Sequence, residues 1–152
     1  MVRRYVVKII FLFVKIRKWN GIFYEEDEEK AKQQGRKQNS GNLIVEFDLP
    51  NNKNVSEIAV SCMESINVGF ILHPETISLY DISSGSEKLI SSISIAKSDV
   101  DEPDSKKVFK LSLKQKNIQR VRLKIKSNRS LPKGHVAEGQ PAWVFVDEIF
   151  LL

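Results

Sequence analysis

The 152-residue sequence contains a single cysteine, Cys62, and two histidines, His73 and His135. One cysteine cannot form an internal disulfide, and it excludes a zinc site built from several cysteines. No apolar run approaches the roughly 20 residues of a membrane-spanning helix. The hydrophobic content of 41% and the charged content of 28% are those of a globular protein. We therefore expect residues 1–152 to form a single domain without a membrane span.

Positive charge is concentrated in two stretches of the sequence. Six of the 24 basic residues and none of the 19 acidic residues lie within residues 1–24, and eleven basic residues without any carboxylate lie within 106–133. Such a stripe attracts phosphate backbones. In residues 120–126, however, charged and apolar residues alternate as on a half-buried strand, and no aromatic residue is interleaved to stack on bases. The pattern does not favour nucleic acid as a partner. It predicts buried Val121, Leu123 and Ile125, and solvent-facing Arg120, Arg122 and Lys124.

Two N-terminal stretches have unusual compositions. Residues 1–18 are basic around the apolar run 9–14. This run is shorter than the core of an export signal, and no cleavage site of small residues follows it. We expect a buried strand or an atypical arm, and a basic segment on a membrane surface is the alternative. Residues 24–40 are rich in Glu, Lys and Gln without an apolar stripe, which predicts a short solvated helix, an insertion or a loop.

Turn signals divide the remaining sequence into short strand patterns. Clusters at 49–52, 83–85, 99–103 and 130–134 separate segments that are rich in β-branched and aromatic residues. Seven or eight short strands of this kind predict an all-β sandwich or barrel. The segments expected to form strands are 42–48, 56–62, 77–82, 88–95, 108–113, 119–126 and 143–151.

Residues 41–49, 55–63 and 70–80 together resemble a discoidin (coagulation factor type C) domain, with a strand, a hydrophobic linking strand and a proline-containing lead into the next strand. The motif Trp19-Asn-Gly-Ile-Phe23 is similar to the Trp-x-Gly-Phe that opens such modules. The resemblance covers residues 19–152. It implies a galactose-binding-like jelly roll, which is a β-sandwich of about eight antiparallel strands.

The closing segment 131–149 is similar to the end of the type C module of bacterial β-N-acetylhexosaminidases of glycoside hydrolase family 20. Gly134-His135, Gly139 and the run Ala142-Trp-Val-Phe-Val-Asp-Glu-Ile149 carry this similarity. It implies an extracellular or periplasmic accessory module of a glycan-degrading system. The implied ligand is a glycan of the N-acetylglucosamine or galactose type, and the implied partner is a glycoside hydrolase catalytic domain.

Asp147 and Glu148 are adjacent, as are the catalytic acids of family 20 hydrolases, but the Gly-Gly that precedes the catalytic pair is missing here. Adjacent side chains of a strand point to opposite faces, and no second acid is recognisably placed opposite either residue. The acidic run 25–29 is a charge cluster, and motifs for a serine nucleophile or a phosphate loop are missing. We expect no catalytic site within this chain.

A structural calcium ion is the only cofactor that the resemblance implies. Many type C domains hold calcium between an early Asp-containing loop and a late Glu, and Glu148 matches the late position. Calcium takes about six to eight oxygen ligands. The Asp-Gly loop expected before Trp19 is absent from residues 1–18, so most of the ligands stay unassigned.

Sugar binding is the function that the family implies. A sugar site combines an aromatic platform for the apolar C–H face of the ring with side chains that bond to the hydroxyls. The loop between the strands expected at 119–126 and 143–151 supplies such side chains at one end of the sandwich. The candidate sugar-binding residues are Asn128, Arg129, His135 and Trp143, together with Trp19, which we expect to reach the same rim.

Two structural alternatives stay open for these residues. Trp143 and Phe145 share a strand face with Ile149, which favours a core position over a platform, and His135 alternatively only braces the loop. At the level of function, the sequence favours a non-catalytic carbohydrate-binding or accessory module. The alternative is a protein-interaction or adhesion domain without sugar binding, which the missing Asp loop and the basic stripe favour.

Overall fold

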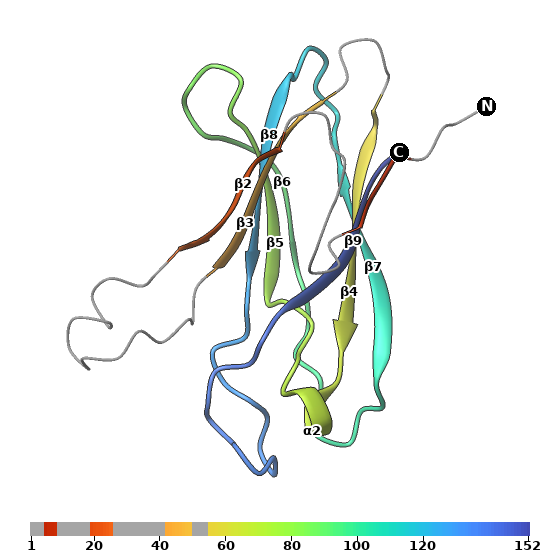
Figure 1. Cartoon of the computed structure of the whole chain (residues 1–152), viewed down its shortest axis with the longest axis vertical. Helices are drawn as coiled ribbons and strands as arrows, with labels where there is room; N and C mark the ends of the chain where they lie inside the picture. Colours follow the sequence, from red (N-terminus) through yellow and green to blue (C-terminus); the bar gives the residue numbers. More distant parts are fainter. Residues whose placement is uncertain (1–4, 9–18, 26–41, 50–54) are drawn as a thin grey trace, which may run out of the picture.

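The computed structural model describes residues 5–8, 19–25, 42–49 and 55–152. These residues form an all-β sandwich, in which two antiparallel sheets pack face to face (Figure 1). The four-stranded sheet has the order β1-β9-β4-β7, and the five-stranded sheet has the order β2-β3-β8-β5-β6. The strands are β1 (Tyr5–Lys8), β2 (Trp19–Glu25), β3 (Asn42–Asp48), β4 (Glu57–Glu64), β5 (Thr76–Asp81), β6 (Lys88–Ser94), β7 (Ser105–Ser112), β8 (Arg120–Lys126) and β9 (Phe145–Leu151), and the one helix among the described residues is α2 (Ile66–Gly69).

The predicted all-β sandwich is therefore confirmed. All seven segments expected to be strands overlap strands β3 to β9, with ends that differ by up to three residues. The alternation expected in β8 is also correct, because Val121, Leu123 and Ile125 are fully buried between the sheets. The charged residues of β8 lie on the opposite face, where they are half-buried rather than freely solvated.

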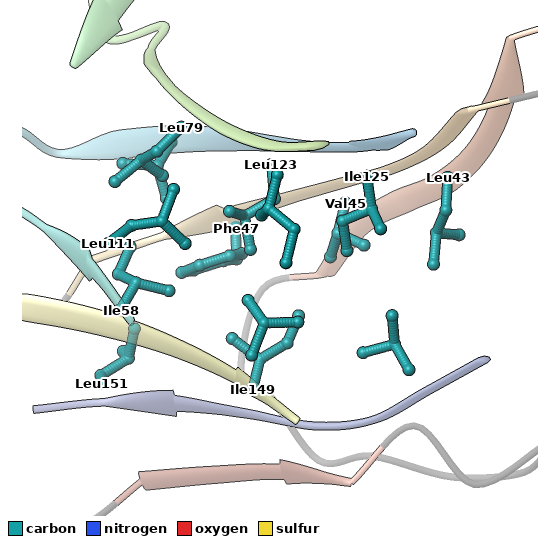
Figure 2. Close-up of a cluster of buried hydrophobic side chains, with 14 of the residues drawn as sticks. Leu43, Val45, Phe47, Ile58, Leu79, Leu111, Leu123, Ile125, Ile149 and Leu151 are labelled. Atoms are coloured by element: carbon teal, nitrogen blue, oxygen red, sulfur yellow. The ribbon is translucent and has the colours of Figure 1, made fainter. Parts of the chain in front are cut away.

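The main core lies between the two sheets. Alternating residues of strands β3 to β9 point inward, and the inward side chains of the two sheets meet (Figure 2). Phe47 of β3 is the one aromatic side chain that is fully buried in this cluster. The other labelled core residues are Leu43, Val45, Ile58, Leu79, Leu111, Leu123, Ile125, Ile149 and Leu151.

A second, smaller apolar cluster closes one end of the sandwich. It joins α2, the segment that follows it, and the long β8–β9 loop. Its buried members are Ile66, Leu72, Leu131 and Ala142, and Phe70 packs against them. This cluster fixes the β8–β9 loop against α2, at the opposite end of the molecule from the C-terminus (Figure 1).

Several expectations for the N-terminal part lie outside the described residues. The apolar run 9–14 is one of them, and so is the charged stretch 24–40 apart from its first two residues, which end β2. Within residues 1–18 the structure describes β1, which pairs with β9 at the edge of the four-stranded sheet.

Candidate functional site

The β8–β9 loop, residues 127–144, contains four of the five predicted sugar-binding residues. Two backbone hydrogen bonds hold its arms together, because the N–H of Leu131 donates to the carbonyl of Gln140 and the N–H of Ala142 donates to that of Asn128. The loop turns tightly at Gly134, where a φ of 87° favours glycine. The loop thus has a defined conformation that is held by its own backbone hydrogen bonds.

Trp143 is exposed, with 59% of its surface accessible. Its backbone is fixed on both sides, since its N–H donates to the Phe70 carbonyl at 2.9 Å and its carbonyl accepts from the Leu72 N–H at 3.1 Å. Ala142 and Val144 on either side pack inward against the two apolar clusters. The expectation that Trp143 belongs to the core is therefore wrong.

A β-bulge explains why the core expectation fails. On β4, Ser61 pairs with Glu148 and the next residue, Cys62, pairs with Val146, so Asp147 is an extra residue in β9. Before this extra residue, the positions that face inward and outward are exchanged relative to the positions that follow it. Trp143 consequently points away from the face on which Ile149 is buried, and so does the half-buried Phe145.

Asn128 and His135 are buried braces of the loop. The Asn128 side-chain amide donates to the His73 carbonyl at 2.8 Å. His135 Nδ1 accepts the Ala137 N–H at 2.9 Å, which leaves Nε2 as the protonated nitrogen that donates to the Ile66 carbonyl at 3.0 Å. This confirms the alternative in which His135 braces the loop. Asn128 and His135 hold the loop against α2 and the segment that follows it, while the side chains of Arg129 and Trp143 are exposed.

Trp19 does not lie at this end of the sandwich. Its backbone pairs with Phe47 of β3, which in turn pairs with Val121 near the start of β8. The loop leaves β8 after Lys126, about five residues or roughly 16 Å further along the strand. The prediction that Trp19 reaches the rim of the loop is therefore wrong.

The outer face of the four-stranded sheet carries an apolar patch that the sequence pattern did not predict. Met63 of β4 is the cross-strand partner of Phe145. Val108 of β7 is the cross-strand partner of Ser61, which lies two residues before Met63 on the same face of β4. Met63 is 39% exposed and Val108 is 52% exposed. Together with Trp143 they form the outer strip, defined here as Trp143, Phe145, Met63 and Val108. The sequence pattern does not predict this strip, because the bulge places Phe145 on the outer face and alternation alone does not reveal a bulge.

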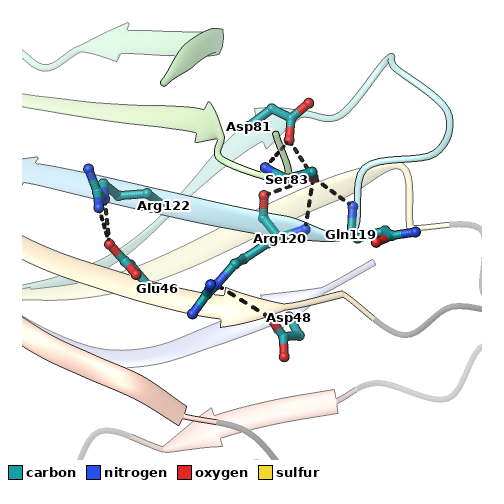
Figure 3. A network of polar contacts seen from close by, with 7 residues as sticks. All are labelled: Glu46, Asp48, Asp81, Ser83, Gln119, Arg120 and Arg122. Carbon is teal, nitrogen blue, oxygen red and sulfur yellow. Dashed lines mark hydrogen bonds and ion pairs between the residues drawn. The ribbon is translucent and has the colours of Figure 1, made fainter. Parts of the chain in front are cut away.

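The outer face of the five-stranded sheet carries a ladder of ion pairs instead, of which Figure 3 shows the Arg120–Asp48 and Arg122–Glu46 pairs. Arg122 bonds to both Glu46 and Glu87, and Lys124 lies 3.2 Å from Glu87. Arg120 Nε is 3.6 Å from Asp48, and Lys126 Nζ is 3.2 Å from Glu75. All four basic side chains of β8 therefore have acidic partners, which argues against their use as a phosphate-binding stripe. The pairs, referred to below as the ion-pair ladder, are Arg120–Asp48, Arg122–Glu46, Arg122–Glu87, Lys124–Glu87 and Lys126–Glu75.

A buried polar cluster lies beneath the loop end. Glu64 accepts the His73 backbone N–H at 3.0 Å and the Ser98 hydroxyl at 2.7 Å, and His73 Nε2 is 3.1 Å from the Ser105 hydroxyl. Burial lowers the pKa of His73 from its ordinary value near 6.5; Glu64 opposes this shift and Lys107 reinforces it. In a catalytic triad the acid bonds to Nδ1. Here Glu64 Oε1 approaches Nε2 at 4.0 Å, and Nδ1 has no partner among the described residues.

The remaining chemical candidates are dispersed. Burial, with Asp147 acting in the same direction, raises the pKa of the Cys62 thiol to about 12, so the thiolate is negligible at neutral pH. Asp147 forms an ion pair with Lys106 across the outer face. Glu148, the calcium candidate, pairs with Ser61 on β4 and with Lys8 on β1. Within the described residues no group of three or more His, Cys, Asp or Glu side chains is placed to hold a metal ion.

No family model matches the chain, and no curated protein matches it either. In the described part of the chain, no helix has the length and apolar character needed to cross a membrane. A functional assignment therefore depends on the residues of the exposed surfaces themselves.

Proposed function

We propose that the chain is a non-catalytic carbohydrate-binding or accessory module with a galactose-binding-like jelly-roll fold. The observation that carries the proposal is the exposed Trp143, which is fixed by backbone hydrogen bonds on both sides. A large apolar side chain in solvent gains free energy when a ligand covers it. Because the backbone is fixed, binding has to order only the two side-chain torsions of the indole, which favours a stacking platform.

The loop supplies polar groups beside this platform. Arg129 is exposed on the loop, and a guanidinium is a donor type suited to hydroxyl oxygens. Asn128 and His135, although predicted to bind sugar, act in this proposal by holding the loop in place. The ligand class is a glycan of the N-acetylglucosamine or galactose type. A shallow site of this kind gives a dissociation constant of about 0.1–1 mM.

The proposed setting is an extracellular or periplasmic glycan-degrading system. The module would act beside a β-hexosaminidase-like catalytic domain and bring it to its substrate. The closing-segment similarity supports this setting. A structural calcium would involve Glu148, and its other ligands would have to come from outside the described residues.

The second candidate is a protein-interaction or adhesion domain without sugar binding. The outer strip favours it, because methionine and aromatic side chains are enriched in protein interfaces. Both candidates use the same face of the sandwich, so a ligand-binding experiment separates them.

Calorimetric titration with N-acetylglucosamine and with galactose tests the proposal. Trp143→Ala is expected to weaken binding of the preferred sugar at least about tenfold, and the variant should stay folded because the side chain is exposed. Leu89→Ala is the matched control, since Leu89 is an exposed apolar residue on the other sheet. The proposal fails if neither sugar binds to the wild type, or if Trp143→Ala and Leu89→Ala bind equally well.

A further inference from the structure

The outer strip crosses three neighbouring strands of the four-stranded sheet. Phe145 of β9 lies opposite Met63 of β4, and Met63 lies opposite Lys106 of β7. Val108 follows Lys106 by one outward position on β7. Trp143 precedes Phe145 on the same face, since Ala142, Val144 and Val146 all point inward. The exposed tryptophan is thus the end of a longer apolar path rather than an isolated residue.

We propose that the glycan surface continues from Trp143 along the outer strip, so that the ligand is an oligosaccharide lying across β9, β4 and β7. This inference rests on the proposed carbohydrate-binding function and extends it. It assigns Phe145, Met63 and Val108 to the binding surface, and it distinguishes a chain ligand from a single sugar.

The spacing of the strip suits a chain of sugar rings. Neighbouring strands lie about 4.8 Å apart, so the strip offers a new apolar contact at a repeat comparable to the length of one pyranose ring. On β4 the neighbouring positions Ala59 and Ser61 are only 1% and 0% exposed, so the strip crosses this strand at Met63. An extended ligand along the strip therefore contacts β4 at Met63.

The polar groups of the strip favour a glycan over a protein partner. Lys106 lies opposite Met63, and its ion pair with Asp147 reaches from β7 to β9 across the strip. Charged residues, and lysine in particular, are depleted from the centres of protein interfaces. Sugar hydroxyls both donate and accept hydrogen bonds, so they can bond to the ammonium and to the carboxylate. An apolar strip crossed by an ion pair whose lysine is exposed matches the alternating C–H and hydroxyl surfaces of a glycan.

The test is a titration against chain length, with the monosaccharide, trimer and hexamer of N-acetylglucosamine and a matching galactose series. For the wild type we expect the hexamer to bind at least about tenfold more tightly than the monosaccharide. In Met63→Ser and Val108→Ser most of this gain should disappear, so that the ratio of hexamer affinity to monosaccharide affinity falls toward one. Leu89→Ser on the five-stranded sheet serves as the control and should keep the gain.

The outcomes separate this inference from the function on which it rests. If monosaccharide binding depends on Trp143 but affinity does not rise with chain length, the strip inference is wrong and the function stands. If the gain survives in both strip variants, the inference is also wrong. If no sugar of any length binds, both fall. Sedimentation of the same samples tests one further alternative. If the chain self-associates and both Met63→Ser and Val108→Ser abolish this self-association, the strip is an interface between copies of the chain and the inference is wrong.

Discussion

The two outer faces of the sandwich are built from opposite kinds of side chain. On the five-stranded sheet, the ion-pair ladder gives each of the four basic residues of β8 an acidic partner. These partners come from β3, from the loop between β5 and β6, and from the residue just before β5. On the four-stranded sheet, the outer strip leaves apolar side chains in solvent, with the Lys106–Asp147 ion pair across them and the Lys110–Glu57 pair further along β7 and β4. A charged face satisfied within the chain needs no ligand. An exposed apolar face has free energy to gain from one, which is why we place the function on the four-stranded sheet.

The largest expected effect comes from breaking the ion-pair ladder. Glu46 is only 8% exposed, and the guanidinium of Arg122 is its partner at 2.6 Å. Arg122→Ala leaves this carboxylate nearly buried and unpaired, so we expect the free energy of unfolding to fall by about 2–3 kcal/mol. Lys124→Ala, at a more exposed pair on the same strand, should cost less than about 1 kcal/mol. Urea denaturation measures both, and equal losses would show that burial of Glu46 does not set the strength of the ladder.

A smaller effect is expected from acid, and it should differ between the two sides of the sandwich. Burial lowers the pKa of His73, beside Glu64 and Ser105 of the four-stranded sheet. The unfolded chain then takes up a proton more readily than the folded chain, so stability falls as the pH drops below about 6.5. His73→Gln should flatten this first loss when the denaturation midpoint is followed from pH 8 to pH 5. A midpoint of the wild type that stays constant over this range would contradict the buried, neutral His73.

The Glu87 pairs of the ladder should respond to acid only at lower pH. Burial raises the pKa of Glu87, but the hydrogen bonds from Arg122 and Lys124 outweigh it and hold this pKa below its ordinary value near 4.5. Its contribution to stability is therefore complete above about pH 4.5 and is lost as the pH falls further. In His73→Gln this second loss should remain, which distinguishes the two sides.

The sequence was sufficient where regular alternation decides the structure. Strict alternation in β8 predicted its buried residues and its charged face, and turn signals located the strands from β3 onward. The acidic partners of β8 were not predictable, because Glu46, Asp48, Glu75 and Glu87 are brought beside it only when the strands pair.

The candidate site was predicted less well, for two physical reasons. The bulge at Asp147 depends on how β9 pairs with β4, and a count of alternating residues cannot detect the extra residue. Trp143 was therefore assigned preferentially to the core and the outer strip was missed. Polar side chains in a loop also do not reveal which of them are used internally, as Asn128 and His135 are. Arg129 and Trp143 remain the exposed members of the predicted set.

The most direct measurement is NMR mapping of a hexasaccharide onto both faces. Isotope-labelled protein would be titrated with the hexamer of N-acetylglucosamine or of galactose, whichever binds more tightly. We expect shifts for the Trp143 indole N–H, the Met63 and Val108 methyl groups and the Lys106 amide, with the amides of Arg122 and Lys124 unchanged. Shifts confined to the ladder, or an absence of shifts with either sugar, would contradict the assignment of ligand binding to the outer face of the four-stranded sheet.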